Sequence, residues 1–147
     1  MKKFWEKYKV LIIIIVAVCA FVSLSLLSEK RVETTKMGDI AVWAEEAPAS
    51  DFAITIIALS YCDHCKEFNP IITEVAKEYS IPIYWFEYDL LDAEGQNTLV
   101  STFDFTEYEG ASPYMAITKK NEVVAQNVGK LGKEATIEFL KTNNIIK

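Results

Sequence analysis

The sequence is poor in the residues that bind metal ions and in those that build disulfide scaffolds. It has a single histidine, His64, and three cysteines, one of which, Cys19, falls in a long apolar run. The other two, Cys62 and Cys65, form one CxxC motif, whereas a disulfide scaffold would spread its cysteines along the chain. Internal repeats and low-complexity tracts are also absent. These absences leave the CxxC motif as the main chemical feature of the chain.

Positive charge is scarce outside the first nine residues. The whole chain has a formal net charge of −6, and residues 1–9 contribute +3 from four lysines and one glutamate. Because residues 10–27 are uncharged, residues 28–147 carry a net charge of −9. Such an acidic region repels phosphate groups, so we expect neither nucleic acid nor anionic lipid as its partner.

The amino terminus has the pattern of a membrane anchor. Four lysines in residues 1–9 precede an apolar run over residues 10–27 that contains no charge, glycine or proline. The run is close to the roughly 20 apolar residues that a helix needs to cross a bilayer. The lysines place the amino terminus in the cytoplasm. We therefore expect a cytoplasmic n-region at 1–9, a single-pass transmembrane helix at 10–27 and an extracytoplasmic remainder.

A cleaved signal peptide is the main alternative to this anchor. Ala20 and Ser25 each have a small or tolerable residue three positions before them, as a cleavage site requires. Apolar residues continue past each of these cuts, which favours the anchor. A lipoprotein cut before Cys19 is disfavoured by Val18, which stands where a small residue is needed.

Apolar periodicity after residue 50 predicts one α/β domain over residues 51–147, with a mixed sheet between helices. Phe52–Leu59 is apolar on both faces, which is typical of a central strand. The predicted order is β-α-β-α-β-β-α. Further strands are expected at 83–88, 114–118 and 123–128, with a four-residue connection between the last two, and helices from the CxxC to Tyr79 and at 93–103 and 133–143.

Residues 28–50 allow two interpretations. Thr34 or Thr35 could cap a helix from about Lys36 to Glu46, which residues 48–50 would end. This segment is then either a linker or the first helix of the domain.

The position of the CxxC predicts a reactive thiol. Cys62 follows a strand and opens a helix, so free amide groups and the positive end of the helix dipole favour its thiolate. In such settings the thiol pKa falls from about 8.5 to between about 3.5 and 7.5. Cys65 lies one turn further on the same face and can resolve a mixed disulfide on Cys62. A protonated His64 would stabilise the thiolate, whereas Asp63 opposes it.

The motif allows two other interpretations. A zinc site on Cys62, His64 and Cys65 needs a fourth ligand, and the chain has no other histidine and no other cysteine beyond the apolar run. Zinc would then require a dimer or a carboxylate. The chance placement of two inert thiols is disfavoured, because oxidation outside the cell would join them.

The chain resembles the thioredoxin family from about Phe52 to its end. The family follows its CxxC with Lys and, five residues after the second Cys, with a helix-kinking Pro; here these are Lys66 and Pro70. It also places a cis-proline before the third strand, which Pro113 matches, and a Gly after the closing hairpin, which Gly129 matches. The resemblance implies a thioredoxin-like fold and thiol–disulfide exchange.

The resemblance also implies roles for the neighbouring residues. A cis-Pro113 would bring the Ser112 backbone beside Cys62, where it can pair with an extended substrate. Tyr61 takes the place of the family's Trp before the first Cys, and we expect both Tyr61 and Ser112 to bind substrate. The resemblance makes Pro113 the substrate-side platform of the site.

One departure from the family pattern bears on the direction of electron flow. Ile56 stands where cytoplasmic thioredoxins have a buried acid that helps to deprotonate the resolving thiol. The His of the CxxC is shared with oxidases and isomerases, which shifts the expected potential from about −270 mV toward about −120 to −180 mV.

Two aromatic stretches flank the expected site. Residues 90–112 are longer than in a minimal thioredoxin and contain "FDFTEYEG", which would overhang the active face as a solvated loop or as an acidic selector of substrates. The run of aromatic residues over 84–88 is interpreted as sheet core.

The sequence thus predicts a membrane-tethered thiol–disulfide oxidoreductase of the bacterial cell membrane, acting on protein or peptide thiols with a redox partner protein and without cofactor or metal. Cys62 is the expected nucleophile, Cys65 the resolving thiol and His64 the tuner of the thiolate. Size, anchor and CxxC loosely resemble bacteriocin transport accessory proteins. A disulfide reductase and a non-catalytic docking module remain alternatives.

Overall fold

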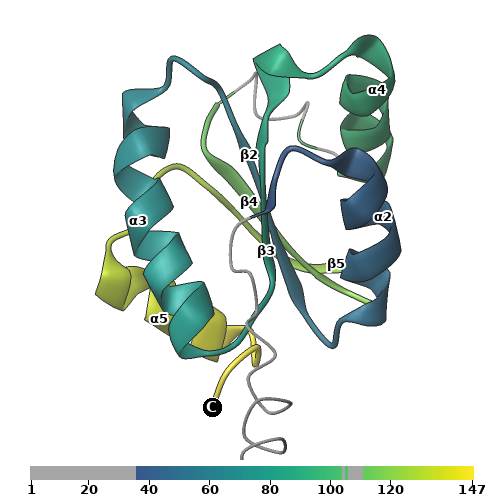
Figure 1. The fold of residues 1–147 in the computed structure, drawn as a ribbon. Helices are drawn as coiled ribbons and strands as arrows, with labels where there is room; N and C mark the ends of the chain where they lie inside the picture. Colours follow the sequence, from purple (N-terminus) through teal and green to yellow (C-terminus); the bar gives the residue numbers. More distant parts are fainter. Residues whose placement is uncertain (1–35, 104, 106–110) are drawn as a thin grey trace, which may run out of the picture. The chain divides into compact units, whose positions relative to one another are not determined.

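The computed structural model describes residues 36–103, 105 and 111–147, all of which fall in one compact unit (Figure 1). The apolar run predicted as an anchor, residues 10–27, lies outside the described residues. Among the described helices, none combines the length and the apolar character that crossing a bilayer requires.

The core of the fold is a five-stranded mixed sheet in the order β1-β3-β2-β4-β5. The first three strands are parallel to one another, whereas β4 is antiparallel to both of its neighbours, β2 and β5. This arrangement confirms the predicted mixed sheet. The strands are β1 (Lys36–Met37), β2 (Ala53–Ala58), β3 (Ile83–Glu87), β4 (Tyr114–Lys119) and β5 (Glu122–Val128).

Helices cover both faces of the sheet, α3 and α5 on one side and α2 and α4 on the other (Figure 1). Successive residues of a strand point to opposite faces of the sheet. Since every residue of the central strand β2 is buried, β2 packs against helices on both faces. Ile54 and Ile56 join the cluster under α3, and Ala53 and Ile57 join the cluster under α2 and α4. The helices are α2 (Ile40–Ala49), α3 (Asp63–Glu78), the 3₁₀ turn η1 (Tyr88–Leu90), α4 (Ala93–Thr102) and α5 (Lys133–Thr142).

The amino-terminal part of the domain differs from the prediction. Residues 36 and 37 form β1, which pairs with β3, and the helix begins only at Ile40. Gly38, with φ +78°, turns the chain between the two, and the Asp39 carboxylate caps the helix at 2.9 Å from the Ala41 amide. Thr34 and Thr35, the caps we expected, lie outside the described residues.

The segment expected to be a linker or a first helix is part of the domain. Trp43 of α2 is 6% exposed, and its indole Nε1 donates to the Thr55 hydroxyl of β2 at 3.0 Å. Its ring also lies 5.6 Å from that of Phe103, the residue that ends α4. The domain therefore includes β1 and α2 and starts well before the expected boundary at residue 51.

The hairpin between β4 and β5 is tighter than expected. The strands extend to Lys119 and Glu122, so that only Lys120 and Asn121 form the turn. Both residues have positive φ, 49° and 70°, as a two-residue turn matched to the strand twist requires. The predicted four-residue connection was too long because β-strand propensity alone does not show where pairing stops.

Candidate active site

Cys62 is the N-cap residue of α3, at the end of the short loop that leaves β2. Its backbone is extended, with φ −81° and ψ 111°, and its amide donates to the Leu59 carbonyl at 3.0 Å. The Cys65 amide in turn donates to the Cys62 Sγ at 3.1 Å. A sulfur atom therefore occupies the place where a capping oxygen usually accepts from the first turn of a helix.

Cys62 and Cys65 form a disulfide in this structure, with their Cα atoms 5.2 Å apart. The two sulfurs have different surroundings. Cys65 is 1% exposed and packs in the cluster that contains Ile56 and Phe68, whereas Cys62 is only partly buried. An incoming thiolate can therefore reach Cys62 and not Cys65.

The loop before β4 approaches the disulfide from the other side. The Ser112–Pro113 peptide bond is cis, and the Ser112 carbonyl oxygen lies 3.8 Å from the Cys62 Sγ. Since a disulfide sulfur carries no proton, this is a close contact rather than a hydrogen bond in the oxidised form. Pro113 is buried, and its carbonyl accepts from the Gly129 amide at 2.8 Å, which fixes the loop against the end of β5.

The remaining predicted site residues lie on the surface beside the disulfide. Tyr61 is 71% exposed, and His64 is exposed in the first turn of α3. The Asp63 carboxylate, which we expected to oppose a thiolate, lies 3.3 Å from the Lys66 ammonium. The structure thus gathers Tyr61, His64 and Ser112 around Cys62, and their roles stay predictions.

Sequence reasoning missed a contact that holds the loop before Cys62. The Asp89 carboxylate, in the turn η1 that follows β3, accepts from the Ser60 amide at 2.8 Å and from the Ser60 hydroxyl at 2.5 Å. The hydrogen bond from the Ser60 hydroxyl, followed by the bond from its amide, lowers the pKa of Asp89 below its ordinary value. Both residues follow predicted strands, so their position at the carboxyl edge of neighbouring parallel strands was the available signal.

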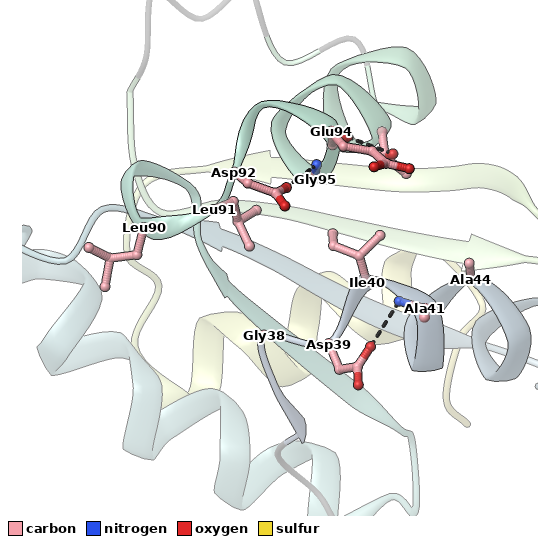
Figure 2. Close-up of a pocket in the computed structure, with 11 residues that line it drawn as sticks. Gly38, Asp39, Ile40, Ala41, Ala44, Leu90, Leu91, Asp92, Glu94 and Gly95 are labelled. Carbon is pink, nitrogen blue, oxygen red and sulfur yellow. Dashed lines mark hydrogen bonds between the residues drawn. The ribbon is translucent and has the colours of Figure 1, made fainter.

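A groove lies between the amino termini of α2 and α4, apart from the disulfide (Figure 2). It is an open groove of about 800 Å³, and Ile40 and Leu91 project into it between the two helices. Two of its acidic residues, Asp39 and Asp92, cap their own helices, at 2.9 Å from the Ala41 amide and 2.8 Å from the Gly95 amide. Among the described residues that line this groove there is neither a cysteine nor Ser112.

The aromatic run over 84–88 is largely sheet core, as predicted, since Tyr84, Trp85 and Phe86 are all buried. Burial, together with the neighbouring Glu46 carboxylate, raises the pKa of Tyr84 to about 12. Most of the "FDFTEYEG" segment lies outside the described residues, but Phe103 is fully buried and Phe105 partly so.

Metal ligands do not gather anywhere in the described part of the chain. No three His, Cys, Asp or Glu side chains of these residues come close enough together to hold an ion. The Cys62–Cys65 disulfide also leaves neither sulfur available as a thiolate ligand in this form.

Comparison with known proteins gives one family match. A family model described as Thioredoxin matches residues 29–142, which is well over half of the chain and includes β1, α2 and the CxxC. No curated protein matches the chain.

Proposed function

The chain belongs to the thioredoxin family, and from that premise we propose that its CxxC pair catalyses thiol–disulfide exchange on protein or peptide substrates. We further propose that it works outside the cytoplasmic membrane and oxidises or isomerises its substrates rather than reducing them. The observation that carries the proposal is Cys62, a partly exposed sulfur that caps a helix and forms a disulfide with a buried partner.

In the oxidising direction, a substrate thiolate attacks the Cys62 Sγ of the disulfide. A bond forms between substrate sulfur and Cys62, the Cys62–Cys65 bond breaks, and Cys65 leaves with the electron pair and takes up a proton. A second substrate thiolate then attacks the substrate sulfur of this mixed disulfide and releases Cys62 as a thiolate. The substrate dithiol loses two electrons and two protons. One proton stays on Cys65 and the other goes to solvent, and a redox partner protein must later remove the two electrons to restore the Cys62–Cys65 disulfide.

The surroundings of the Cys62 Sγ favour the release of Cys62 as a thiolate from the mixed disulfide. The Cys65 amide, 3.1 Å from the Cys62 Sγ, points at the atom on which charge develops, and the α3 dipole adds to its effect. Stabilising the thiolate stabilises the reduced enzyme, and a stabilised reduced form makes a stronger oxidant. The exposed His64 would add a positive charge at the same helix tip when it is protonated.

The surroundings of Cys65 support the same direction. Ile56 is 0% exposed and lies in the cluster that contains Cys65, at the place where the reducing members of the family have a proton-accepting acid. An aliphatic side chain cannot take the proton of Cys65. Reduction of substrates, which needs Cys65 to attack as a thiolate, is therefore disfavoured.

The proposed location is supported by the sequence of residues 1–27, with lysines before an uncharged apolar run. Labelling of intact cells with a maleimide that cannot cross membranes tests it. Cys62 should be labelled after mild reduction without lysis, and labelling only after lysis would place the domain in the cytoplasm. The mass of the mature protein decides between an anchor and a cleaved leader.

The function itself is tested with purified protein. The oxidised domain should oxidise a dithiol peptide stoichiometrically, and the Cys62→Ala variant should not. Equilibration with glutathione buffers should give a potential between about −120 and −180 mV. A potential near −270 mV or lower would assign the protein to the reductases, and full biological function of Cys62→Ala would assign it to non-catalytic docking modules.

A further inference from the structure

A small cavity opens beside the disulfide, on the same side of the sheet as α2 and α4. It has a volume of about 70 Å³ and lies between the carboxyl end of β2, η1 and the loop before β4. None of the described residues that line it is charged, and its floor is buried. The residues on which the argument rests are Ile57, Leu59, Tyr88, Phe105, Ser112 and Tyr114.

Two backbone contacts join this cavity to the reactive sulfur. Leu59, on one wall, accepts the hydrogen bond of the Cys62 amide at 3.0 Å. Ser112, on another wall, has its carbonyl oxygen 3.8 Å from the Cys62 Sγ. Since an extended chain advances about 3.3 Å per residue, a peptide whose cysteine meets Cys62 places a side chain one or two positions away over the cavity.

The volume selects the kind of side chain that fits. An engineered protein cavity of about 150 Å³ binds a benzene molecule. At about 70 Å³ the cavity is about half that size, so it suits a short aliphatic side chain such as valine better than an aromatic ring. A charged side chain would lose hydration there without finding a charged partner among the described residues of the lining.

The walls are held by aromatic packing. The Phe105 ring meets the Tyr88 ring edge to face with centroids 5.5 Å apart, and it lies 5.7 Å from the Tyr114 ring. Tyr114 is 1% exposed, and its hydroxyl donates to the Gln126 side chain at 2.9 Å. Because these rings pack on one another without a ligand, a side chain that enters has little ordering cost to overcome.

We infer that this cavity is a specificity pocket for a short aliphatic side chain next to the reacting cysteine of the substrate. The inference rests on the proposed exchange function and names its substrate class: extended peptides in which valine, or a residue of similar size, stands one or two positions from the cysteine. Backbone pairing with Ser112 holds the peptide, and the pocket chooses among side chains.

The test is a single-turnover reaction of the oxidised protein with matched peptide thiols. The peptides differ only in one residue beside the cysteine, which is Val, Ala, Phe or Asp, placed one or two positions before or after it. The peptide thiolate attacks the Cys62 Sγ and releases the Cys65 thiol. The released thiol is alkylated, and the alkylated protein is quantified by mass spectrometry. At one of these positions the Val peptide should react about 10-fold faster than the Ala peptide, because two buried methyl groups separate them. The Phe and Asp peptides should be slower than Val.

Two variants change the pocket in opposite directions, and each rate is normalised to the reaction of the same variant with glutathione. Phe105→Ala enlarges the cavity and should raise the relative rate of the Phe peptide. Ala111→Leu, at an exposed residue of the rim, should remove the advantage of Val. Val124→Ala, on the far edge strand β5, is the matched apolar truncation and should leave the ranking unchanged.

The possible outcomes distinguish failure of the pocket hypothesis from failure of the proposed exchange function. Equal normalised rates for all peptides at every position, with reactions that still depend on Cys62, would overturn the pocket and leave the exchange function standing. Absence of any Cys62-dependent reaction, with peptides and glutathione alike, would overturn both. A ranking that neither pocket variant alters would also overturn the pocket, since the preference would then arise elsewhere.

Discussion

The amino termini of α2 and α4 meet at the groove of Figure 2, whereas that of α3 lies at the disulfide and has a different kind of cap. Asp39 and Asp92 cap the first two with carboxylates, whereas Cys62 caps α3 with a sulfur. A carboxylate is charged in every redox state at neutral pH. The sulfur is neutral in the disulfide and becomes negative only when the disulfide is opened.

This difference shows that an N-cap can contribute either to the stability of the fold or to the reaction. At the carboxylate caps, the attraction between the helix terminus and a negative charge is present whenever the protein is folded. At Cys62 the same attraction appears only after reduction, so it stabilises the product of the reaction rather than the fold. The groove of Figure 2 is accordingly a structural region, and the tip of α3 is the reactive one.

The largest expected effect comes from giving α3 the cap of the other helices. Cys62→Asp should abolish exchange completely, because no sulfur remains for an incoming thiolate to attack. It should also be more stable than Cys62→Ala by about 1 kcal/mol, since Asp caps a helix and Ala does not. Peptide oxidation and urea unfolding of both variants measure the two effects. Equal stability of the two would show that the tip of α3 does not behave as an ordinary helix terminus.

The second effect separates the two sulfurs. Cys65→Ala leaves the partly exposed Cys62 but removes the thiol that resolves a mixed disulfide. The variant should therefore accumulate covalent complexes with its substrates, which mass spectrometry can name. Cys62→Ala is the matched control and should accumulate none, because Cys65 is 1% exposed. Comparable trapping by both variants would mean that Cys65 is also accessible.

The third effect tests the carboxylate caps. Asp92→Ala should cost about 1 kcal/mol of unfolding free energy, because the Gly95 amide loses its partner. The pH dependence of Cys62 alkylation in the reduced protein should not change. Glu94→Ala, which removes a carboxylate from the same helical turn but not the N-cap, is the control and should cost less. A shifted alkylation profile in Asp92→Ala would contradict the separation of the two regions.

The same alkylation profile tests the cap of α3. In the unmodified protein the Cys62 thiol should ionise below about pH 8.5, the value of a free cysteine, because the helix terminus favours its thiolate. Iodoacetamide reaction rates across pH give this midpoint. A midpoint at or above that of free cysteine would remove the electrostatic argument for catalysis.

The smallest expected effect concerns the contact between Asp89 and Ser60. Asp89 precedes the groove residue Leu90, and Ser60 lies in the loop before Cys62. The Ser60 bonds lower the pKa of Asp89, so their stabilising contribution is complete above the ordinary pKa of an aspartate and is lost as pH falls through the lowered value. Ser60→Ala should raise the Asp89 pKa back toward its ordinary value, because the hydroxyl bond is its first cause. Carboxyl carbon shifts in an NMR titration measure this, with Asp51 as a reference in the same spectra. An unchanged Asp89 titration would show that the hydroxyl bond has no part in it.

Much of the fold could be predicted because its signals are local. The buried run at β2, the 3.6-residue period of α3 and the match of Pro70, Pro113 and Gly129 to one family pattern were sufficient for the mixed sheet and for the position of the CxxC. Local signals were insufficient at β1, since two residues carry no periodicity and their pairing with β3 depends on a strand about 50 positions away.

The candidate site likewise has residues that could be predicted from the sequence and features that could not. Cys62 and Cys65 could be identified from spacing alone. The Asp89–Ser60 contact was missed, because the two residues are 29 positions apart and neither belongs to a motif; only their shared position after two predicted strands pointed to it. The cavity beside Ser112 was equally hidden, because its walls come from four separate segments of the chain.

By itself, the sequence determined that a CxxC opens a helix after a central strand, and hence that one sulfur sits at the positive end of a helix dipole. That follows from spacing along the chain, which sets what lies within one turn or one strand. Only the tertiary structure decided that Cys65 is buried, that Ser112 approaches Cys62 and that a cavity of valine size lies beside them. Those facts depend on the order in which strands pair, and distant segments meet only when the sheet has formed.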